Sequence, residues 1–332
     1  MSKTLIIAEA GVNHNGKLDI AFQLCKAAKE AGADVIKFQT WITEKIITRT
    51  ITQAEYQKQN TGTMDSQFDM LKKLELSFND FRKIKAYCDD LDIIFASTAD
   101  EQESLDFLIC LGIPFIKIGS GEITNIPYLR YVGSKQMPTI LSCGMSTLAD
   151  IDCAIRILLE AGAKDLTLLH CTTNYPCPYD EVNLMAIKTL SETFGIPTGY
   201  SDHTKGIEVP IAAVALGAKV IEKHFTLDCN MNGPDHLAST EPSEFKRMVD
   251  CVRNVEVSLG NGIKRPTASE KEISEVVLKR IVALKDIEEG QCFSEEMLTV
   301  KRCDKGIPAQ YWDLVIGTKA KRSYVIDDPI DL

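Results

Sequence analysis

The feature that most constrains the fold is a repeated junction, in which a helical segment ends at a glycine and runs directly into a short apolar strand. The junction occurs as EAGADVIKFQ, CLGIPFIKIGS, EAGAKDLTLLHC and ALGAKVIEKHF. Glycine is the usual residue after a helix C-terminus, because it adopts the left-handed backbone conformation without a steric penalty. Repetition of a helix followed by a buried strand predicts parallel βα architecture.

Eight apolar segments with strand character alternate with helical segments along the first part of the chain. The helical segments show the expected spacing, as in Ala21, Leu24, Cys25 and Ala28. Eight βα units predict a TIM (β/α)8 barrel, whose active site lies at the C-terminal ends of the strands. The predicted strands cover residues 5–10, 35–40, 93–98, 115–120, 139–143, 166–171, 198–201 and 220–225.

The alternation of predicted strands and helices ends near residue 259. The stretch GNGIKRPTASEKE is rich in glycine, proline and charge and has no apolar stripe, which predicts a linker. Beyond it, RIVALKDIEEGQCF, MLTVKRCDKGI and YVIDDPIDL predict short strands around a small helix near residues 309–315. We therefore expect a catalytic barrel over residues 1–260, a linker over 261–279 and a small C-terminal domain over 280–332.

Composition excludes several classes of function. The formal net charge of -10 argues against a nucleic acid partner, because phosphate binding requires a basic surface. No apolar run reaches membrane-spanning length and the first residues show no signal-peptide cleavage pattern, so we expect a cytoplasmic protein with no membrane partner. The eleven cysteines form no CxxC or evenly spaced framework, which agrees with reduced thiols.

Two histidines suggest a metal site. His203 and His224 each close a predicted strand, and each follows a polar residue, Ser201 or Glu222, by two positions. Side chains two apart on a strand share a face, so two neighbouring strands would direct both imidazoles at one cation. The alternative is that His203 caps a turn and His224 is a core histidine.

Two lysines lie inside otherwise apolar strands. Lys37 in VIKFQ and Lys117 in FIKIG are costly to bury unless they are paired, so we expect them to point into the barrel mouth at an anion. With nearby hydroxyls and the amides of GSGE they form a cradle suited to phosphate and carboxylate. The alternative is that they pair with Glu9 or Glu222 for structural reasons alone.

A series of motifs at the strand ends extends over nearly the whole chain. They are AEAGVNHNG, IKFQT, YQKQNTG, SQFDMLKKLELS, KIGSGE, LSCGMS, HCTTNYP, GYSDHT, EKHFTLD and GPDHLAS. In this order they resemble the sialic acid synthases, bacterial enzymes that make nine-carbon sugar acids such as N-acetylneuraminic and legionaminic acid. The tail VKRCDKGI is similar to the antifreeze-like (SAF) domain of these enzymes.

The resemblance implies a reaction and a cofactor. Phosphoenolpyruvate would condense with the open-chain aldehyde of an N-acylated mannosamine-type sugar, either N-acetylmannosamine or 2,4-diacetamido-2,4,6-trideoxymannose, and phosphate would leave with C–O cleavage. A divalent cation, typically manganese, with magnesium or cobalt as alternatives, would bind His203 and His224. The positions that correspond to phosphoenolpyruvate contacts are Lys37, Thr98, Lys117, Ser120, Ser142 and Ser201.

The sugar site follows from the same resemblance. Glu222 and Glu9 are the two candidates for the catalytic proton donor, and either could instead hold sugar hydroxyls or a lysine. Further sugar contacts correspond to Asn60, Tyr175 and Asp235, and to Arg302 of the other subunit in a domain-swapped homodimer.

The sequence departs from the family pattern beside the phosphate site. Many members read STPFD where this chain reads STADE, so Ala99 and Asp100 replace proline and phenylalanine next to Thr98. Thr173 stands where many members carry asparagine. The resemblance therefore does not specify the phosphate contacts near Thr98 and Thr173.

Two other functions are consistent with parts of the sequence. A metal-assisted TIM-barrel hydrolase would need a third strong metal ligand, and none obvious accompanies the two histidines. A carbohydrate-binding protein without enzyme activity is suggested only by the tail. The identity of the sugar depends on the shape of the pocket, which one sequence does not specify.

Overall fold

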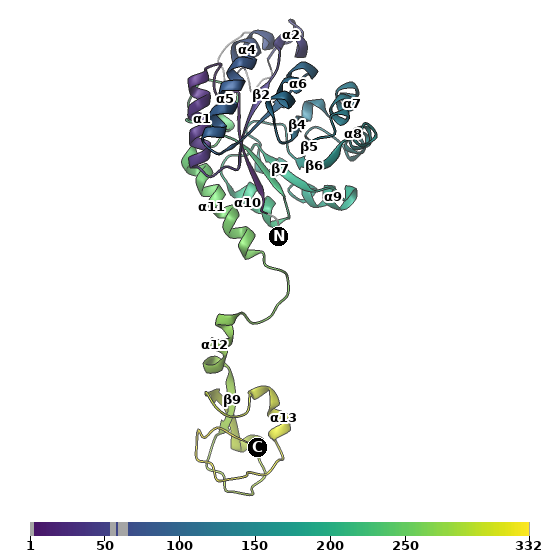
Figure 1. Ribbon diagram of the computed structural model, residues 1–332. Helices are drawn as coiled ribbons and strands as arrows, with labels where there is room; N and C mark the ends of the chain where they lie inside the picture. Colours follow the sequence, from purple (N-terminus) through teal and green to yellow (C-terminus); the bar gives the residue numbers. More distant parts are fainter. Residues whose placement is uncertain (1–2, 54–57, 59–65, 332) are drawn as a thin grey trace. The chain divides into compact units, whose positions relative to one another are not determined.

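The computed structural model describes residues 3–53, 58 and 66–331. The chain divides into two compact units, Met1–Gly260 and Asn261–Leu332. In the first unit, eight parallel strands close into a barrel in the order β1 to β8 (Figure 1), which confirms the predicted TIM barrel. The strands are β1 (Leu5–Gly11), β2 (Val35–Thr40), β3 (Ile94–Ala99), β4 (Ile116–Ile118), β5 (Pro138–Ser142), β6 (Lys164–His170), β7 (Thr198–Asp202) and β8 (Val220–His224).

Helices surround the barrel and connect its strands. The last of them, α11, packs against α1 and α10, so the ring of helices closes next to its starting point (Figure 1). The helices of this unit are α1 (Leu18–Glu30), α2 (Thr43–Ile46), α4 (Gln67–Leu74), α5 (Phe78–Asp90), α6 (Gln102–Leu111), α7 (Ile126–Ser134), α8 (Leu148–Glu160), α9 (Met185–Phe194), α10 (Glu208–Ala215) and α11 (Pro242–Ser258), with 3-10 turns η1 (Ser120–Glu122), η2 (Tyr179–Glu181) and η3 (His236–Ala238).

The junction glycines behave as the sequence predicts. Gly32, Gly112, Gly162 and Gly217 have φ values of 84°, 88°, 108° and 103°, each in the region that L side chains rarely adopt. Each glycine turns the chain from a helix end toward the next strand, which explains why the sequence repeats this signal.

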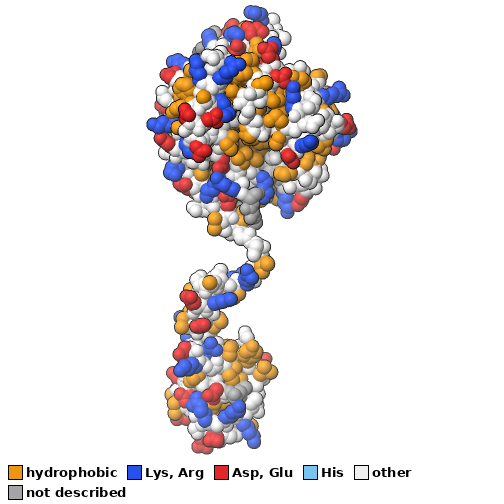
Figure 2. Space-filling view, viewed as in Figure 1, with side chains coloured by type: hydrophobic (Ala, Val, Ile, Leu, Met, Phe, Trp, Pro, Cys, Tyr) orange, Lys and Arg blue, Asp and Glu red, His pale blue; other side chains and the backbone are white. Residues whose placement is uncertain are grey.

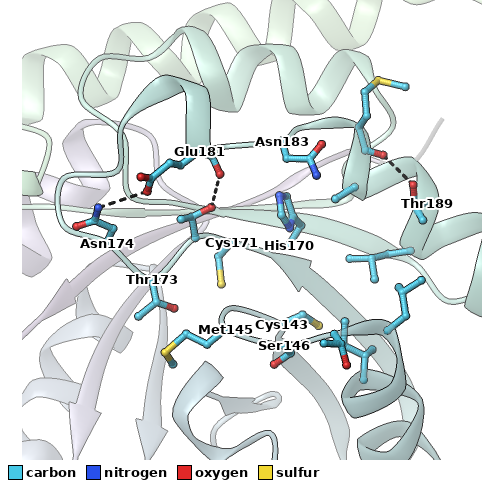
Figure 3. Close-up of a pocket in the computed structure, with 17 residues that line it drawn as sticks. Cys143, Met145, Ser146, His170, Cys171, Thr173, Asn174, Glu181, Asn183 and Thr189 are labelled. Atoms are coloured by element: carbon cyan, nitrogen blue, oxygen red, sulfur yellow. Dashed lines mark hydrogen bonds between the residues drawn. The ribbon is translucent and has the colours of Figure 1, made fainter.

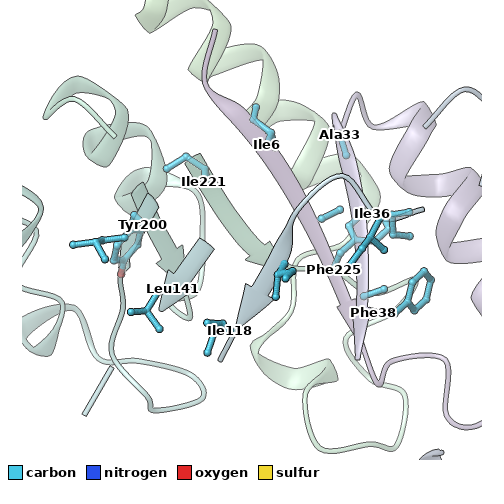
Figure 4. Close-up of a cluster of buried hydrophobic side chains, with 14 of the residues drawn as sticks. Ile6, Ala33, Ile36, Phe38, Ile118, Leu141, Tyr200, Ile221 and Phe225 are labelled. Atoms are coloured by element: carbon cyan, nitrogen blue, oxygen red, sulfur yellow. The ribbon is translucent and has the colours of Figure 1, made fainter. Parts of the chain in front are cut away.

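Successive side chains of each strand point to opposite faces of the barrel wall, so the strands contribute to two separate apolar clusters. Side chains such as Ile6, Ile36 and Ile221 belong to the large cluster between barrel and helices (Figure 4). Ile7 and Val35 point the other way and belong to a smaller cluster inside the barrel. Ile7 lies opposite Val35, and two residues later Glu9 lies opposite Lys37, so charged side chains sit directly above the apolar interior.

The second unit has a small core of its own, built around Ile281, Phe293, Val315 and Tyr324. Part of the segment expected to be a linker forms a helix that begins at a capping box. The last stretch, YVIDDPIDL, contributes isolated bridges rather than a full strand. The elements are α12 (Ala268–Val277), the antiparallel pair β9 (Lys279–Ala283) and β10 (Leu298–Arg302), η4 (Glu295–Met297), η5 (Ala309–Tyr311) and α13 (Trp312–Val315).

Acidic and basic side chains are interspersed on the visible face of each unit (Figure 2). Within the described ranges, no helix has the length and apolar character needed to cross a membrane. All eleven cysteines are free thiols.

Candidate active site

The register of the barrel brings the predicted site residues to one level. Glu9 lies opposite Lys37, and Ser201 lies opposite Glu222 across neighbouring strands. They surround a cavity of about 190 Å³ at the C-terminal ends of the strands. The predicted residues that line it are Glu9, Lys37, Thr98, Lys117, Ser120, Ser142, Tyr175, Ser201, His203, Glu222 and His224.

Two lysines and two glutamates alternate around this cavity. Lys37 Nζ lies 2.6 Å from Glu9 Oε2 and 3.6 Å from Glu222 Oε2, while Lys117 Nζ lies 3.5 Å from Glu222 Oε1. All four side chains are almost fully buried. Lys37 and Lys117 therefore line the cavity and are also paired with these glutamates.

Hydroxyl groups complete the polar wall. Lys37 Nζ donates to Thr98 Oγ1 at 2.9 Å, and Lys117 Nζ donates to Ser142 Oγ at 2.8 Å. The backbone N–H of Gly144 donates to Ser120 Oγ at 3.0 Å. Ammonium groups and hydroxyls that converge on one cavity form a cradle for an anion.

The two glutamates have opposite electrostatic environments. Burial raises the pKa of Glu9, and the nearby Glu222 carboxylate raises it further, against the opposing effect of Lys37. Burial also disfavours the charged form of Glu222, but Lys117 and Lys37 outweigh it and hold the pKa of Glu222 below its usual range. The two lysines thus favour the charged form of Glu222, whereas burial favours the protonated form of Glu9.

The two histidines lie side by side at the cavity wall. Their ring centroids are 5.4 Å apart, and the ring of Tyr175 lies 4.1 Å from that of His203. Burial lowers the pKa of both histidines, which favours the neutral imidazole that binds metal ions.

The hydrogen bonds of this pair fit a metal site. His203 Nδ1 lies 2.6 Å from the carbonyl oxygen of Thr172, so it carries the proton and leaves Nε2 as an acceptor. In the described part of the chain, His224 Nδ1 is buried without a hydrogen-bond partner. With metal–nitrogen bonds of about 2.1 Å, rings at this separation can share one cation.

Comparison with known proteins identifies the family. The NeuB family description matches residues 24–264, and the SAF domain description matches residues 280–332. The chain belongs to the NeuB family. This confirms the resemblance to the sialic acid synthases and the expected SAF domain after the barrel.

Relatives of this NeuB-family chain cover its full length. It is 46% identical over 332 residues to the N,N'-diacetyllegionaminic acid synthase of Campylobacter jejuni, spanning 99% of each chain. It is 46% identical over 318 residues to the enzyme of the same name from Legionella pneumophila, spanning 95% of this chain and 89% of that one. It also resembles the solved N-acetylneuraminic acid (sialic acid) synthetase from Leptospira borgpetersenii in complex with citrate, with a TM-score of 0.73 and 34% identity, covering 82% of this chain and 91% of that one.

Among the described predicted residues of the barrel unit, Asp235 is the one that does not line the cavity. Asp235 Oδ2 is 3.9 Å from His224 Nδ1, and burial raises the pKa of Asp235 to about 6. Asn60 lies outside the residues that the structure describes. Arg302 ends β10 in the second unit, where its side chain is exposed.

Asp100 is a cavity residue that the sequence analysis treated only as a departure from the family pattern. It lines the cavity. Burial, and to a smaller extent the nearby Glu122 carboxylate, raise the pKa of Asp100 to about 7. Asp100 comes two positions after Thr98 and directly follows β3. The period-two alternation of the strand could have placed both side chains on the cavity face.

A wider groove of about 840 Å³ adjoins the site cavity. Its walls are the chain segments that follow β5 and β6, with Met145 and Ser146 on one side and Asn174 and Glu181 on the other (Figure 3). The groove and the cavity share three wall residues, Met145, Cys171 and Thr173.

Proposed function

We propose that this NeuB-family chain condenses phosphoenolpyruvate with an N-acylated mannosamine-type sugar and releases phosphate with cleavage of a C–O bond. The observation that carries the proposal is the joint presence of two lysines, Lys37 and Lys117, and two neutral histidines in one cavity. The two relatives at 46% identity support 2,4-diacetamido-2,4,6-trideoxymannose, which leads to a legionaminate, ahead of N-acetylmannosamine.

The anion cradle would hold phosphoenolpyruvate. Lys37 and Lys117 provide the charge, and their hydroxyl partners Thr98 and Ser142 are already within hydrogen-bond distance of each ammonium group. Ser120 presents its hydroxyl beside the Gly144 amide. Because the lysines are paired with glutamates, the cavity carries no large uncompensated charge before the substrate arrives.

A divalent cation, which we expect to be manganese, would bind His203 and His224. When bound, it would supply Lewis-acid polarisation of the sugar aldehyde. Among the described residues, no group of three or more His, Cys, Asp or Glu side chains could hold a metal ion. Two protein ligands leave coordination positions for water and the sugar carbonyl oxygen, which fits a synthase better than a hydrolase.

Glu9 is the proton carrier in this proposal. As C3 of the enol forms a bond to the aldehyde carbon, the aldehyde oxygen becomes an alkoxide and takes the proton of Glu9. Water then adds to the cationic C2 and returns one proton to Glu9. The remaining proton of the C2 hydroxyl passes to the departing phosphate as the C2–O bond breaks, which leaves the 2-keto group and inorganic phosphate. The raised pKa of Glu9 supports this role, whereas Glu222 remains ionised and orients the lysines and Ser201.

The sugar would extend from the histidines toward Tyr175 and Asp235. Tyr175 packs on the His203 ring, and Asp235 lies close to His224. The family resemblance adds Asn60 and Arg302 to this set.

The experiment is a turnover assay of the purified full chain with phosphoenolpyruvate, manganese and each of the two sugars. We expect stoichiometric phosphate and a nine-carbon 2-keto acid, loss of turnover in chelator, and recovery with added manganese. Release of phosphate without a sugar, or no turnover with any N-acylated hexosamine, would contradict the proposal.

We also propose that the active form is a domain-swapped homodimer, in which Arg302 of one copy completes the sugar site of the other. Arg302 is exposed at the end of β10, which supports its availability to a second copy. The test mixes inactive Arg302→Ala and Lys37→Ala proteins after partial unfolding and refolding. Mixed dimers should regain activity at one intact site, and a mixture that stays inactive although mixed dimers form would refute the swap.

A further inference from the structure

A fully buried ion pair lies directly behind the two cavity histidines. Lys223 Nζ is 2.5 Å from Asp202 Oδ2, and both side chains have 0% exposure. The two residues are opposite each other on β7 and β8. Asp202 immediately precedes His203, and Lys223 immediately precedes His224.

The pair points away from the cavity. Ser201 and His203 line the cavity from one strand, and Glu222 and His224 line it from the next. Because successive side chains of a strand alternate, Asp202 belongs to the opposite face, as does Lys223.

Further hydrogen bonds tie this pair to the segment that carries His203. Lys223 Nζ donates to the carbonyl oxygen of Thr204 at 2.8 Å. Asp202 Oδ1 accepts from Thr204 N at 3.0 Å and from Thr204 Oγ1 at 2.8 Å. The residues on both sides of His203 are therefore held by one ammonium group on the strand that ends at His224.

Stability alone does not explain such a pair. Taking two charges out of water costs several kcal/mol for each ion, and well-packed apolar residues of similar volume often serve equally well or better. What an ion pair with saturated hydrogen bonds adds is a defined relative position of the two strands.

We infer that Asp202 and Lys223 are positioning residues, which fix the separation of His203 and His224 so that both imidazoles bind one divalent cation. The inference rests on the proposed function only for the presence of that cation. It concerns metal affinity and not the identity of the sugar.

The central test measures manganese binding by the full chain without substrates, using isothermal titration calorimetry and the electron paramagnetic resonance signal of free Mn²⁺. The variant Asp202→Leu/Lys223→Met removes both charges and replaces them with apolar side chains of similar size. We expect it to fold, as followed by circular dichroism and thermal unfolding, and to bind Mn²⁺ about 10- to 100-fold more weakly. The conservative variant Lys223→Arg should retain most of the affinity.

The matched control is Arg253→Met. It breaks the 2.7 Å ion pair between Arg253 on α11 and Asp34. Asp34 directly precedes β2, so this ion pair lies at the N-terminal end of the strand, whereas the cavity lies at the C-terminal ends. It should leave Mn²⁺ affinity within twofold of the unaltered protein. A purely structural role of the Asp202–Lys223 pair would instead make Mn²⁺ affinity follow thermal stability in both variants.

Two further outcomes would overturn the inference: unchanged Mn²⁺ affinity in a folded Asp202→Leu/Lys223→Met protein, and no Mn²⁺ binding by the unaltered chain. Failure of the proposed function looks different. In that case the unaltered chain still binds Mn²⁺, loses it on His203→Ala, and shows no condensation with any sugar.

Discussion

The Glu9 carboxylate and the Lys37 ammonium group lie 2.6 Å apart on neighbouring barrel strands, and the same ammonium group lies 3.6 Å from Glu222. Lys37 is therefore shared by two carboxylates, whereas Glu222 is shared by two lysines. This asymmetry lets one glutamate hold a proton while the other stays ionised, and it leads to the first two predictions.

Glu9→Gln should reduce kcat by about 10²- to 10⁴-fold, because glutamine keeps the shape of the protonated acid and cannot transfer its proton. Its effect on stability should be small. Glu222→Gln should instead lower the free energy of unfolding by about 3–5 kcal/mol, since it leaves two buried lysines short of a counter-charge. Urea unfolding and steady-state kinetics of both variants check this. A stable but inactive Glu222→Gln beside an active Glu9→Gln would reverse the two roles.

Lys37→Met should raise the KM for phosphoenolpyruvate. At pH values above the raised pKa of Glu9 it should also lower the free energy of unfolding by about 3–5 kcal/mol, because ionised Glu9 then loses its cation within a buried site. Adding Glu9→Gln should restore part of that stability without restoring substrate binding. The coupling free energy from this double-mutant cycle measures the Glu9–Lys37 interaction. Additive effects of the two substitutions on unfolding would show that the pair is not energetically coupled.

Gly144→Ala should weaken phosphoenolpyruvate binding. A Cβ at this position would lie 2.4 Å from Thr173 Oγ1 and 2.9 Å from Ser120 Oγ, so the cradle must shift. Loss or distortion of one hydrogen bond to an anion corresponds to a rise in KM for phosphoenolpyruvate of about tenfold or more. The KM for the sugar serves as the internal control, and equal changes in both KM values would point to a general distortion of the barrel.

His14 and His236 should contribute a loss of stability as pH falls below about 6.5. Burial lowers the pKa of His14 and of His236 from the ordinary value of 6.5 to about 4. Between these values the unfolded chain binds protons that the folded chain does not, so this stabilisation is complete above pH 6.5 and is lost toward pH 4.

Each of these histidines contributes a slope of about 1.4 kcal/mol per pH unit in that window. Urea unfolding at several pH values measures the slope. His14→Phe, which keeps a ring beside Phe38 and cannot be protonated, should reduce it. An unchanged slope would mean that other groups cause the pH dependence.

The sequence by itself determined the architecture and most of the residues that line the cavity. The glycine junctions predicted the βα units because a helix end needs a left-handed residue, as Gly32 and Gly112 have. Lys37, Lys117 and the two histidines could be named in advance, since charged and polar residues at the ends of apolar strands are costly unless they act together.

Only the tertiary structure decided how these groups share charge. The register that sets Glu9 opposite Lys37 and Ser201 opposite Glu222 depends on how eight strands close, which local sequence does not encode. The different pKa shifts of the two glutamates follow from burial and from the number of lysines near each one. The pairing of Asp202 with Lys223 likewise appears only when β7 lies beside β8, because both distances and desolvation are properties of the folded barrel.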